Sequence, residues 1–350
     1  MSQLGRLLAF FPILHHMTCM ASIDVAGAGI VGLWQAYLLR RRGHEVTLWD
    51  PAGIPSSSAA SRLAGAMLAP FCEGEPGHEV AQGLGIEAIP LWEEHYPGTI
   101  RNGTLVVAAA RDHSDLQRFA SIAGGYRRVN GAEISEMEPQ LAGRFREGLF
   151  FEGEAHIEPV AAMGYLAAEV KRLGVICRSE AFEASGSGWV MDCRGLAAKS
   201  VLKSLRGVRG ERIILECAGV TLKRPIRLLH PRVPFYIVPW DRSRFMIGAT
   251  VIESEDSGPP TLRSCTELLS CAYALVPELG EARVIDMAAG IRPAFPDNTP
   301  KIIVRGQHIH VNGLYRHGFL AAPILAQLTD RYIESGIKRE GVVFEDHGEW

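Results

Sequence analysis

IDVAGAGIVGLWQAYLLRRRGHEVTLWD, residues Ile23 to Asp50, is the stretch that decides the fold. An apolar run comes first, and a glycine-rich turn, Gly27–Gly32, follows it. A helical pattern then continues to Arg42, and a second apolar run, Val46–Trp49, leads to Asp50. This succession of strand, glycine turn, helix and strand is the layout of a dinucleotide-binding unit.

Each glycine of this turn has a physical task in such a unit. Gly27 permits the tight turn, Gly29 lets a pyrophosphate come close to the backbone, and Gly32 lets the helix pack against the strand. The anion then meets free N–H groups at the positive end of the helix. Asp50, 18 residues beyond Gly32, is placed to accept hydrogen bonds from ribose hydroxyls. The pattern alone does not distinguish NAD from FAD. The residues predicted to hold the dinucleotide here are Gly27, Ala28, Gly29, Ile30, Val31, Gly32 and Asp50.

The composition is that of a globular protein that binds small molecules. The chain has 350 residues, 47% of them hydrophobic, which is enough for two domains with a large core. The formal net charge is −3, and no block of like charges is long enough to indicate nucleic-acid binding. No run approaches the roughly 20 apolar residues of a membrane span. The oligomeric state is left open, with a homo-oligomer as one alternative.

Seven cysteines are scattered through the chain, and no two of them form a CxxC pair. An odd set without such spacing is typical of reduced thiols, so we expect a cytoplasmic protein without a disulfide framework. The spacing of the cysteines and histidines predicts no metal site.

The first residues do not belong to the opening pattern. Residues 1–21 contain a short apolar run that Pro12 interrupts, and the first strand begins almost at once at Ile23. A signal peptide would have a longer apolar core and a small-residue cleavage site. We therefore expect residues 1–21 to be a disordered leader or a mis-assigned start, with Met20 as the natural beginning.

Two further stretches have the composition of a ligand site. Ser61–Pro70 consists mostly of small residues, which indicates a close approach of the backbone to something bulky, with Ser61 able to donate to a phosphate. Asp192–Gly195 ends an apolar run and opens on glycine. Strand ends of this kind face the ligand crevice in doubly wound sheets.

The order of the elements predicts an α/β protein of two parts, each discontinuous in sequence. The first strand–helix unit is completed only near the C-terminus, by a strand at Ile309–Gly313 and a helix at Pro323–Ser335. Strand-rich sequence from Arg212 to Ala249, punctuated by Pro and Gly, favours an antiparallel sheet. The predicted cofactor-binding part comprises 22–76, 149–210 and 288–340, and the substrate-binding part comprises 77–148 and 211–287.

Four segments of the chain form a specific combination: the turn Gly27–Gly32 with Asp50, the run Ser61–Pro70, the strand pair Phe235–Thr250, and Gly290–Pro293 with Gly313–Gly318. Each segment is a weak signal alone, but their order and spacing are specific. Together they resemble the FAD-dependent D-amino-acid oxidase superfamily, and within it the glycine oxidases of bacterial thiamine (thiazole) biosynthesis, and the resemblance covers residues 22–335.

The resemblance implies an FAD-binding Rossmann-like domain of the glutathione-reductase or D-amino-acid-oxidase type, beside an α+β substrate domain with an antiparallel sheet. It also implies a flavoprotein oxidase that deaminates glycine or another small amino acid or amine. Hydride would pass to flavin N5, and O2 would be reduced to H2O2. The sequence before Arg292 lacks the cysteine that tethers flavin in sarcosine-oxidase relatives, so non-covalent FAD is expected.

The resemblance assigns roles by position. Arg292 matches the arginine that holds the substrate carboxylate, Tyr236 matches the phenol that helps to fix it, and Arg316 matches a residue near flavin and substrate. A planar guanidinium suits a carboxylate because it donates two parallel hydrogen bonds. The remaining predicted cofactor-binding residues are Ser61, Gly65, Met67, Gly195, Gly290, Gly313, Tyr315 and Gly318.

Several nearby residues are expected to have ordinary structural roles. The histidines His156, His230 and His317 are predicted to pack or to form hydrogen bonds, because a lone histidine is usually structural. Glu73 lies just past the small-residue run and could approach the substrate entrance, but the preferred interpretation is an ordinary solvated acid. Trp240 stands where close relatives tend to have arginine, so the contacts at that strand end are left open.

Two other activities remain open on the sequence. A D-amino-acid dehydrogenase would pass electrons to a quinone instead of O2. An FAD-dependent tRNA wobble-uridine modification enzyme would act on nucleic acid and should carry a basic stripe, whereas this chain is slightly acidic. The ranking of glycine, sarcosine and D-amino acids as substrates is not predicted.

Overall fold

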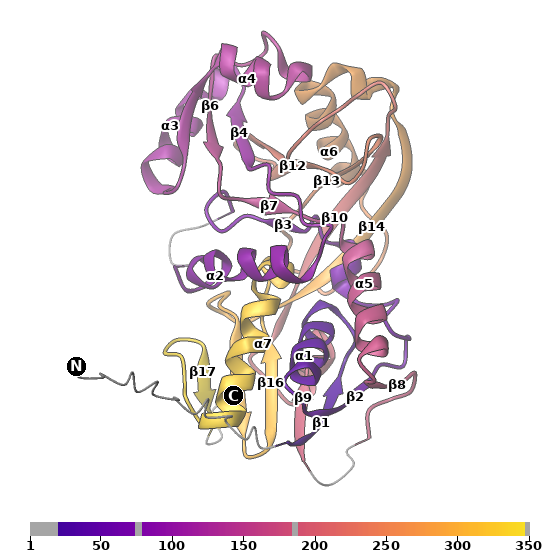
Figure 1. Ribbon diagram of the computed structural model, residues 1–350. Helices are drawn as coiled ribbons and strands as arrows, with labels where there is room; N and C mark the ends of the chain where they lie inside the picture. The colour runs from indigo at the N-terminus through magenta and orange to yellow at the C-terminus, as the bar shows by residue number, and fades with distance from the viewer. Residues whose placement is uncertain (1–19, 74–78, 184–187, 347–350) are drawn as a thin grey trace, which may run out of the picture.

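The computed structural model describes residues 20–73, 79–183 and 188–346, which form two large β-sheets with helices around them (Figure 1). The parallel, Rossmann-like sheet lies in the lower half of the view, and a largely antiparallel sheet lies in the upper half. The predicted α/β fold class is confirmed. The predicted leader, residues 1–21, lies outside the described residues apart from Met20 and Ala21.

The parallel sheet has seven strands in the order β17-β15-β16-β9-β1-β2-β8. β1 (Ser22–Ala26) lies between β2 (Glu45–Trp49) and β9 (Trp189–Asp192) and runs parallel to both. The carboxyl ends of these three strands therefore meet at one edge, where ligands bind in doubly wound sheets. Only β15 and β16 are antiparallel neighbours. The other strands are β8 (Ile176–Arg178), β15 (Lys301–Arg305), β16 (His308–Asn312) and β17 (Val343–Glu345).

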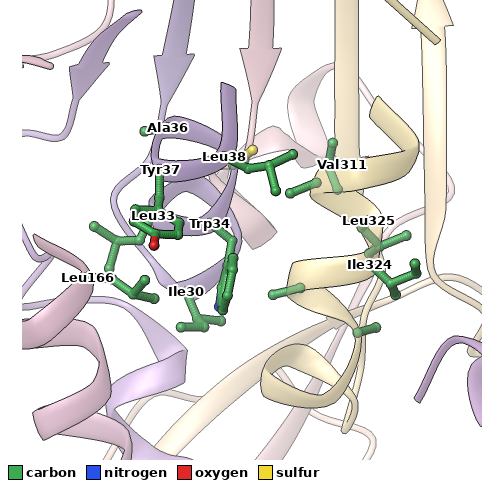
Figure 2. Close-up of a cluster of buried hydrophobic side chains, with 14 of the residues drawn as sticks. Ile30, Leu33, Trp34, Ala36, Tyr37, Leu38, Leu166, Val311, Ile324 and Leu325 are labelled. Carbon is green, nitrogen blue, oxygen red and sulfur yellow. The ribbon is translucent and has the colours of Figure 1, made fainter. Parts of the chain in front are cut away.

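The helices α1 (Ile30–Arg41), α5 (Pro159–Arg172) and α7 (Gly318–Ser335) pack together against this sheet. Figure 2 shows side chains of α1 directed toward Leu166 of α5 on one side and toward Ile324 of α7 on the other. Burial of such side chains removes apolar surface from water and stabilises the fold by roughly 1.5–3 kcal/mol for each large residue.

α7 begins at Gly318, five residues before the helix start that the sequence predicts. A proline inside a helix removes one N–H donor, so Pro323 leaves the carbonyl of Phe319 without its helical partner. The indole N–H of Trp92 donates to that carbonyl at 2.8 Å. A side chain from another helix thus satisfies the carbonyl, and α7 continues through the proline.

α2 (Glu79–His95), which supplies Trp92, packs on α7 and belongs to the core of the parallel sheet. The ring of Trp92 lies edge-on to Trp34 of α1, with 4.9 Å between ring centroids. The sequence instead assigns the whole of 77–148 to the substrate-binding part. An amphipathic pattern predicts that a helix has a buried face, but it does not predict which sheet covers that face.

The second sheet has eight strands in the order β14-β10-β13-β12-β11-β4-β6-β5. Its neighbours are antiparallel except β11 and β4. Three helices, α3 (His113–Ile122), α4 (Gly131–Met137) and α6 (Leu262–Leu275), lie around it. The strands not yet given are β4 (Thr104–Ala108), β5 (Arg127–Asn130), β6 (Glu147–Phe151), β11 (Ile226–Leu229), β12 (Phe235–Pro239) and β13 (Arg244–Gly248).

Two long strands, β10 (Arg206–Glu216) and β14 (Arg283–Ala294), pair along their whole length at one edge of this sheet. They include residues 206–210 and 288–294, which the sequence places in the cofactor-binding part. Their pairing brings Arg292 into the same sheet as Tyr236 of β12.

A small third sheet pairs β3 (Met67–Leu68), from the small-residue run, with β7 (Ala155–His156). Among the described residues, none of the helices has the length and apolar character that crossing a bilayer requires.

Candidate active site

A cavity of about 590 Å³ extends from the carboxyl edge of the parallel sheet to β12 and β14 of the second sheet. This volume lies in the range of small-molecule and cofactor sites. The predicted site residues that line it are Gly27, Gly29, Ile30, Val31, Asp50, Ser61, Gly65, Met67, Gly195, Tyr236, Gly290, Arg292, Tyr315, Arg316 and Gly318. Three others, Ala28, Gly32 and Gly313, are not in its wall.

At one end, the glycine turn and the start of α1 form a cradle. Gly27 has a left-handed φ of +99°, and a Cβ atom there would lie 2.7 Å from the carbonyl oxygen of Cys193. A Cβ atom on Gly29 would meet the Ser61 hydroxyl at 3.4 Å. Glycine is therefore required at position 27, whereas at position 29 it leaves the helix N-terminus open for a pyrophosphate. The cradle suits the pyrophosphate of a dinucleotide.

Asp50 and Ser61 hold this cradle in shape. One carboxylate oxygen of Asp50 accepts from the backbone N–H of Ala28, and the other accepts from Ala52, both at 2.8 Å. The Ser61 hydroxyl accepts from the N–H of Ile30 in the first turn of α1, at 3.2 Å. Both side chains also line the cavity. They are thus placed to serve the turn and a ligand together.

Gly32 and Gly313 have packing roles outside the cavity wall. A Cβ atom on Gly32 would lie 1.7 Å from the carbonyl oxygen of Gly27. A Cβ atom on Gly313, where φ is +73°, would lie 2.0 Å from the ring of Phe295. Glycine is needed at these positions because the neighbouring backbone or ring occupies the space of a side chain.

Asn312 connects two glycine turns of the cavity and is absent from the predicted site. Its amide group donates to the carbonyl of Gly195 at 2.9 Å, and its side-chain oxygen accepts from the N–H of Gly313 at 2.8 Å. The residue is buried and lines the cavity. Its position at the end of an apolar strand, directly before glycine, was the signal available in the sequence.

At the other end of the cavity, β14 presents Arg292. The guanidinium donates to the carbonyl of Thr250 at 3.1 Å and lies against Gly210, where a Cβ atom would be 2.1 Å from it. Burial lowers the pKa of Arg292 below its ordinary value, but arginine stays protonated in proteins. Arg292 forms no ion pair with any described residue. A half-buried cation in this setting is suited to binding an anion.

Tyr236 on β12 lies beside this guanidinium. A Cβ atom on Gly65 would be 2.8 Å from its ring, so glycine in the small-residue run makes room for the phenol. Burial, and then the charge of Glu73, raise the pKa of Tyr236 to about 12. The phenol is therefore neutral at physiological pH and available as a hydrogen-bond donor.

Arg316 and Glu73 form an ion pair in the cavity wall, with 2.7 Å between nitrogen and oxygen. Burial acts to raise the pKa of Glu73, but the charges of Arg316, Arg227 and His317 outweigh it and bring the pKa below its ordinary value. The prediction that Glu73 is a solvated acid is wrong, because its side chain is buried and is paired with Arg316, which lies far from it in sequence.

Arg227 is a further residue near the site that the sequence did not single out. It stands opposite Tyr236 in the pairing of β11 with β12, and it donates to the carbonyl of Cys72. Its guanidinium also lies over the ring of Phe119, 5.0 Å from the centroid. Arg227 therefore holds the segment that carries Glu73.

The three histidines expected to be structural and Trp240 lie outside the cavity wall, unlike Glu73. The ring of His230 accepts from the backbone N–H groups of Arg232 and Val233, as expected for a hydrogen-bonding residue. Burial lowers the pKa of His156 to about 4, so this histidine is neutral at physiological pH. Trp240 is half-buried among apolar residues of the second sheet. The described part of the chain contains no group of three potential metal ligands.

Comparison with known proteins agrees with this geometry. The model of the FAD-dependent oxidoreductase family matches residues 23–331. A Rhizobium etli protein named thiamine biosynthesis oxidoreductase ThiO is 49% identical over 311 residues, covering 87% of this chain and 94% of that protein. The glycine oxidase of Geobacillus kaustophilus is 26% identical over 370 residues, covering 91% of this chain and 94% of that protein.

The crystal structure of a glycine oxidase from Geobacillus kaustophilus has the same fold. It superposes with a TM-score of 0.77 at 22% identity, over 92% of this chain and 97% of that one. The dinucleotide cradle and the family match over residues 23–331 both indicate a dinucleotide cofactor. The chain belongs to the FAD-dependent oxidoreductase family, with FAD as its cofactor.

Proposed function

We propose that this protein is an amino-acid oxidase that deaminates glycine or another small amino acid or amine. The observation that carries the proposal is Arg292, whose half-buried guanidinium lies in the wall of the cofactor cavity without an ion-pair partner among the described residues. Such a group binds a carboxylate through two parallel hydrogen bonds. The neutral phenol of Tyr236 donates a third hydrogen bond to the same carboxylate.

The proposed roles of the other residues follow from their places in the cavity. FAD, when bound, accepts the electron pair of the substrate C–N unit and passes electrons on to O2. Gly27, Gly29 and the start of α1 hold its pyrophosphate, and Asp50 receives the adjacent ribose. Gly290, Tyr315 and Gly318 line the cavity on the side of Arg292 and Arg316 and complete the binding site.

The proposal includes a biosynthetic role and a cellular compartment. The Rhizobium etli relative has thiamine biosynthesis in its name, which supports a role in supplying an imine for thiazole formation. The described cysteines, six in all, are free thiols, which supports a reducing, cytoplasmic compartment.

Peroxide release from glycine, sarcosine and D-alanine tests this function. The protein loaded with FAD should bleach under anaerobic conditions on addition of at least one of these amines, and should release peroxide when air is admitted. Bleaching without rapid reoxidation by air would identify the quinone-linked dehydrogenase instead. If flavin is bound and none of the three reduces it, the proposed function is wrong.

A further inference from the structure

The pair of Glu73 and Arg316 is a buried ion pair inside the wall of the substrate end of the cavity. The side chains are 10% and 12% exposed, and both residues line the cavity. Ion pairs at the surface contribute little to stability because water screens their charges. In a pair removed from water the screening is weaker, so its charges act more strongly on a neighbouring ligand.

The charges around the substrate end do not have equivalent partners. Arg292 contacts a backbone carbonyl and lies near a neutral phenol, whereas Arg316 faces the carboxylate of Glu73. Arg227 is directed to the carbonyl of Cys72 and is outside the cavity wall. Three arginines of the described chain line the cavity: Arg194 is paired with Asp192 and Arg316 with Glu73, whereas Arg292 is left for a ligand.

The backbone that carries Glu73 is held from both sides. The carboxyl group of Glu154 accepts from the N–H of Phe71 at 2.9 Å and from the N–H of Cys72 at 2.7 Å. Arg227 donates to the carbonyl of Cys72 on the other side. These contacts fix the residue directly before Glu73, so its carboxylate is positioned by the fold.

We propose that Glu73 is a specificity-determining residue that restricts the site to substrates with a single carboxylate. The inference rests on the proposed function and goes beyond it. Arg292 takes the one carboxylate, while Glu73 occupies Arg316 and repels a second anionic group. A dicarboxylate would have to bury its second charge beside Glu73, and like charges in a poorly hydrated site disfavour one another.

Neutralising Glu73 should reverse this discrimination. Glu73→Gln removes the negative charge that lies 2.7 Å from the Arg316 guanidinium, so a second anionic group meets less repulsion at this end of the cavity. Charge-assisted hydrogen bonds change affinity by about 10- to 100-fold. We expect the preference for a dicarboxylate over the matching monocarboxylate to increase by at least about tenfold.

The experiment compares two matched ligand pairs on the FAD-loaded protein. Binding of acetate and of malonate is followed by the change in flavin absorbance, which requires no turnover. Oxidation of sarcosine and of iminodiacetate, which differ by one carboxylate, gives the corresponding ratio of kcat/KM. Glu73→Asp keeps the charge and should keep most of the preference for the monocarboxylate. Glu93→Gln removes a carboxylate from the exposed pair with Arg101 and should leave both ratios unchanged.

A double variant separates the two halves of the argument. In Glu73→Gln/Arg316→Gln both the negative and the positive charge are removed, so the preference for malonate should not appear. If Glu73→Gln does not retain FAD, Arg316→Gln alone tests the inference. In that variant the negative charge of Glu73 is no longer balanced by Arg316. Malonate should therefore bind more weakly, relative to acetate, than it does to the parent protein.

The result that overturns the inference is an unchanged acetate-to-malonate ratio in FAD-loaded Glu73→Gln. Failure of the proposed function would look different, because the carboxylates would still perturb the flavin while no amine reduced it. In that case the binding ratio alone decides the role of Glu73.

Discussion

Burial determines what the polar side chains of the site can do. Glu73 is buried and Arg292 and Tyr236 are half-buried, and their pKa values move in directions set by burial and by their neighbours. Arg292 remains charged and has no carboxylate partner within the described part of the chain, whereas Glu73 is charged and paired. Arg292 is therefore a candidate for binding the ligand, and Glu73 is a candidate for determining which ligands are excluded.

Arg292→Lys should weaken substrate binding and leave the flavin in place. Lysine keeps the charge but loses the planar pair of donors, so we expect KM for glycine to rise by about 10- to 100-fold. FAD affinity, measured by fluorescence titration, should change by less than about twofold because the cradle is at the other end of the cavity. Arg212→Lys, in the pair with Asp286 outside the cavity, is the matched control. Equal losses of glycine and FAD affinity would refute the assigned role.

Two segments that form the site are held in place by close contacts with neighbouring elements, and these contacts leave no space for a larger or different side chain. The turn between β1 and α1 is tight because Gly32 packs directly against the carbonyl of Gly27. The segment before Glu73 depends on a carboxyl group from the connection between β6 and β7, Glu154. In both places one element is shaped by a neighbour, so local changes there should affect the whole cavity.

Gly32→Ala should impair the cofactor site although alanine is the better helix former. The new Cβ atom would lie 1.7 Å from a carbonyl oxygen, so the start of α1 has to shift. We expect FAD affinity to fall by at least about tenfold and the melting temperature to decrease. Gly164→Ala in α5 is the control, since nothing lies within 4 Å of its Cβ position. That substitution should stabilise the protein slightly, by about 0.5–1 kcal/mol. Unaltered FAD binding in Gly32→Ala would contradict the packing argument.

Glu154 should make stability depend on pH. Burial raises its pKa from 4.5 to about 8, so the folded state favours the protonated form. Its contribution to the free energy of unfolding is complete below the ordinary pKa and is lost as pH rises toward about 8. Denaturant unfolding of Glu154→Gln between about pH 5 and pH 9 should show a smaller loss of stability than the parent. Glu152→Gln, exposed and two residues away, should retain the parent slope; an equal slope in Glu154→Gln would exclude this account.

Both sheets contribute walls to the cofactor cavity. Residues at the ends of β1, β2 and β9 form one end, and β12 and β14 form the other. A ligand that fills this space contacts both parts of the fold, and it binds only when both are folded.

Adding FAD to the apoprotein should therefore raise the melting temperature of the entire fold. Free FAD at about 100 times its Kd adds about 2.7 kcal/mol, which for 350 residues corresponds to a shift of about 4 °C. Far-UV circular dichroism and tryptophan fluorescence should report the same shift. Stabilisation seen by only one of these signals would mean that the two parts unfold separately.

The sequence of Ile23–Asp50 determined the dinucleotide fold, because glycine spacing and strand–helix periodicity are local properties that backbone geometry requires. The sequence also predicted the roles of Arg292 and Tyr236, because both lie in short, contiguous motifs that resemble a known family. Only the packed chain could place Glu73 against Arg316, 243 positions apart, or supply Trp92 as the partner of a carbonyl that Pro323 leaves open. Those contacts join segments that are far apart in sequence. Their energy depends on how deeply the side chains are buried, and a local sequence pattern does not predict that burial.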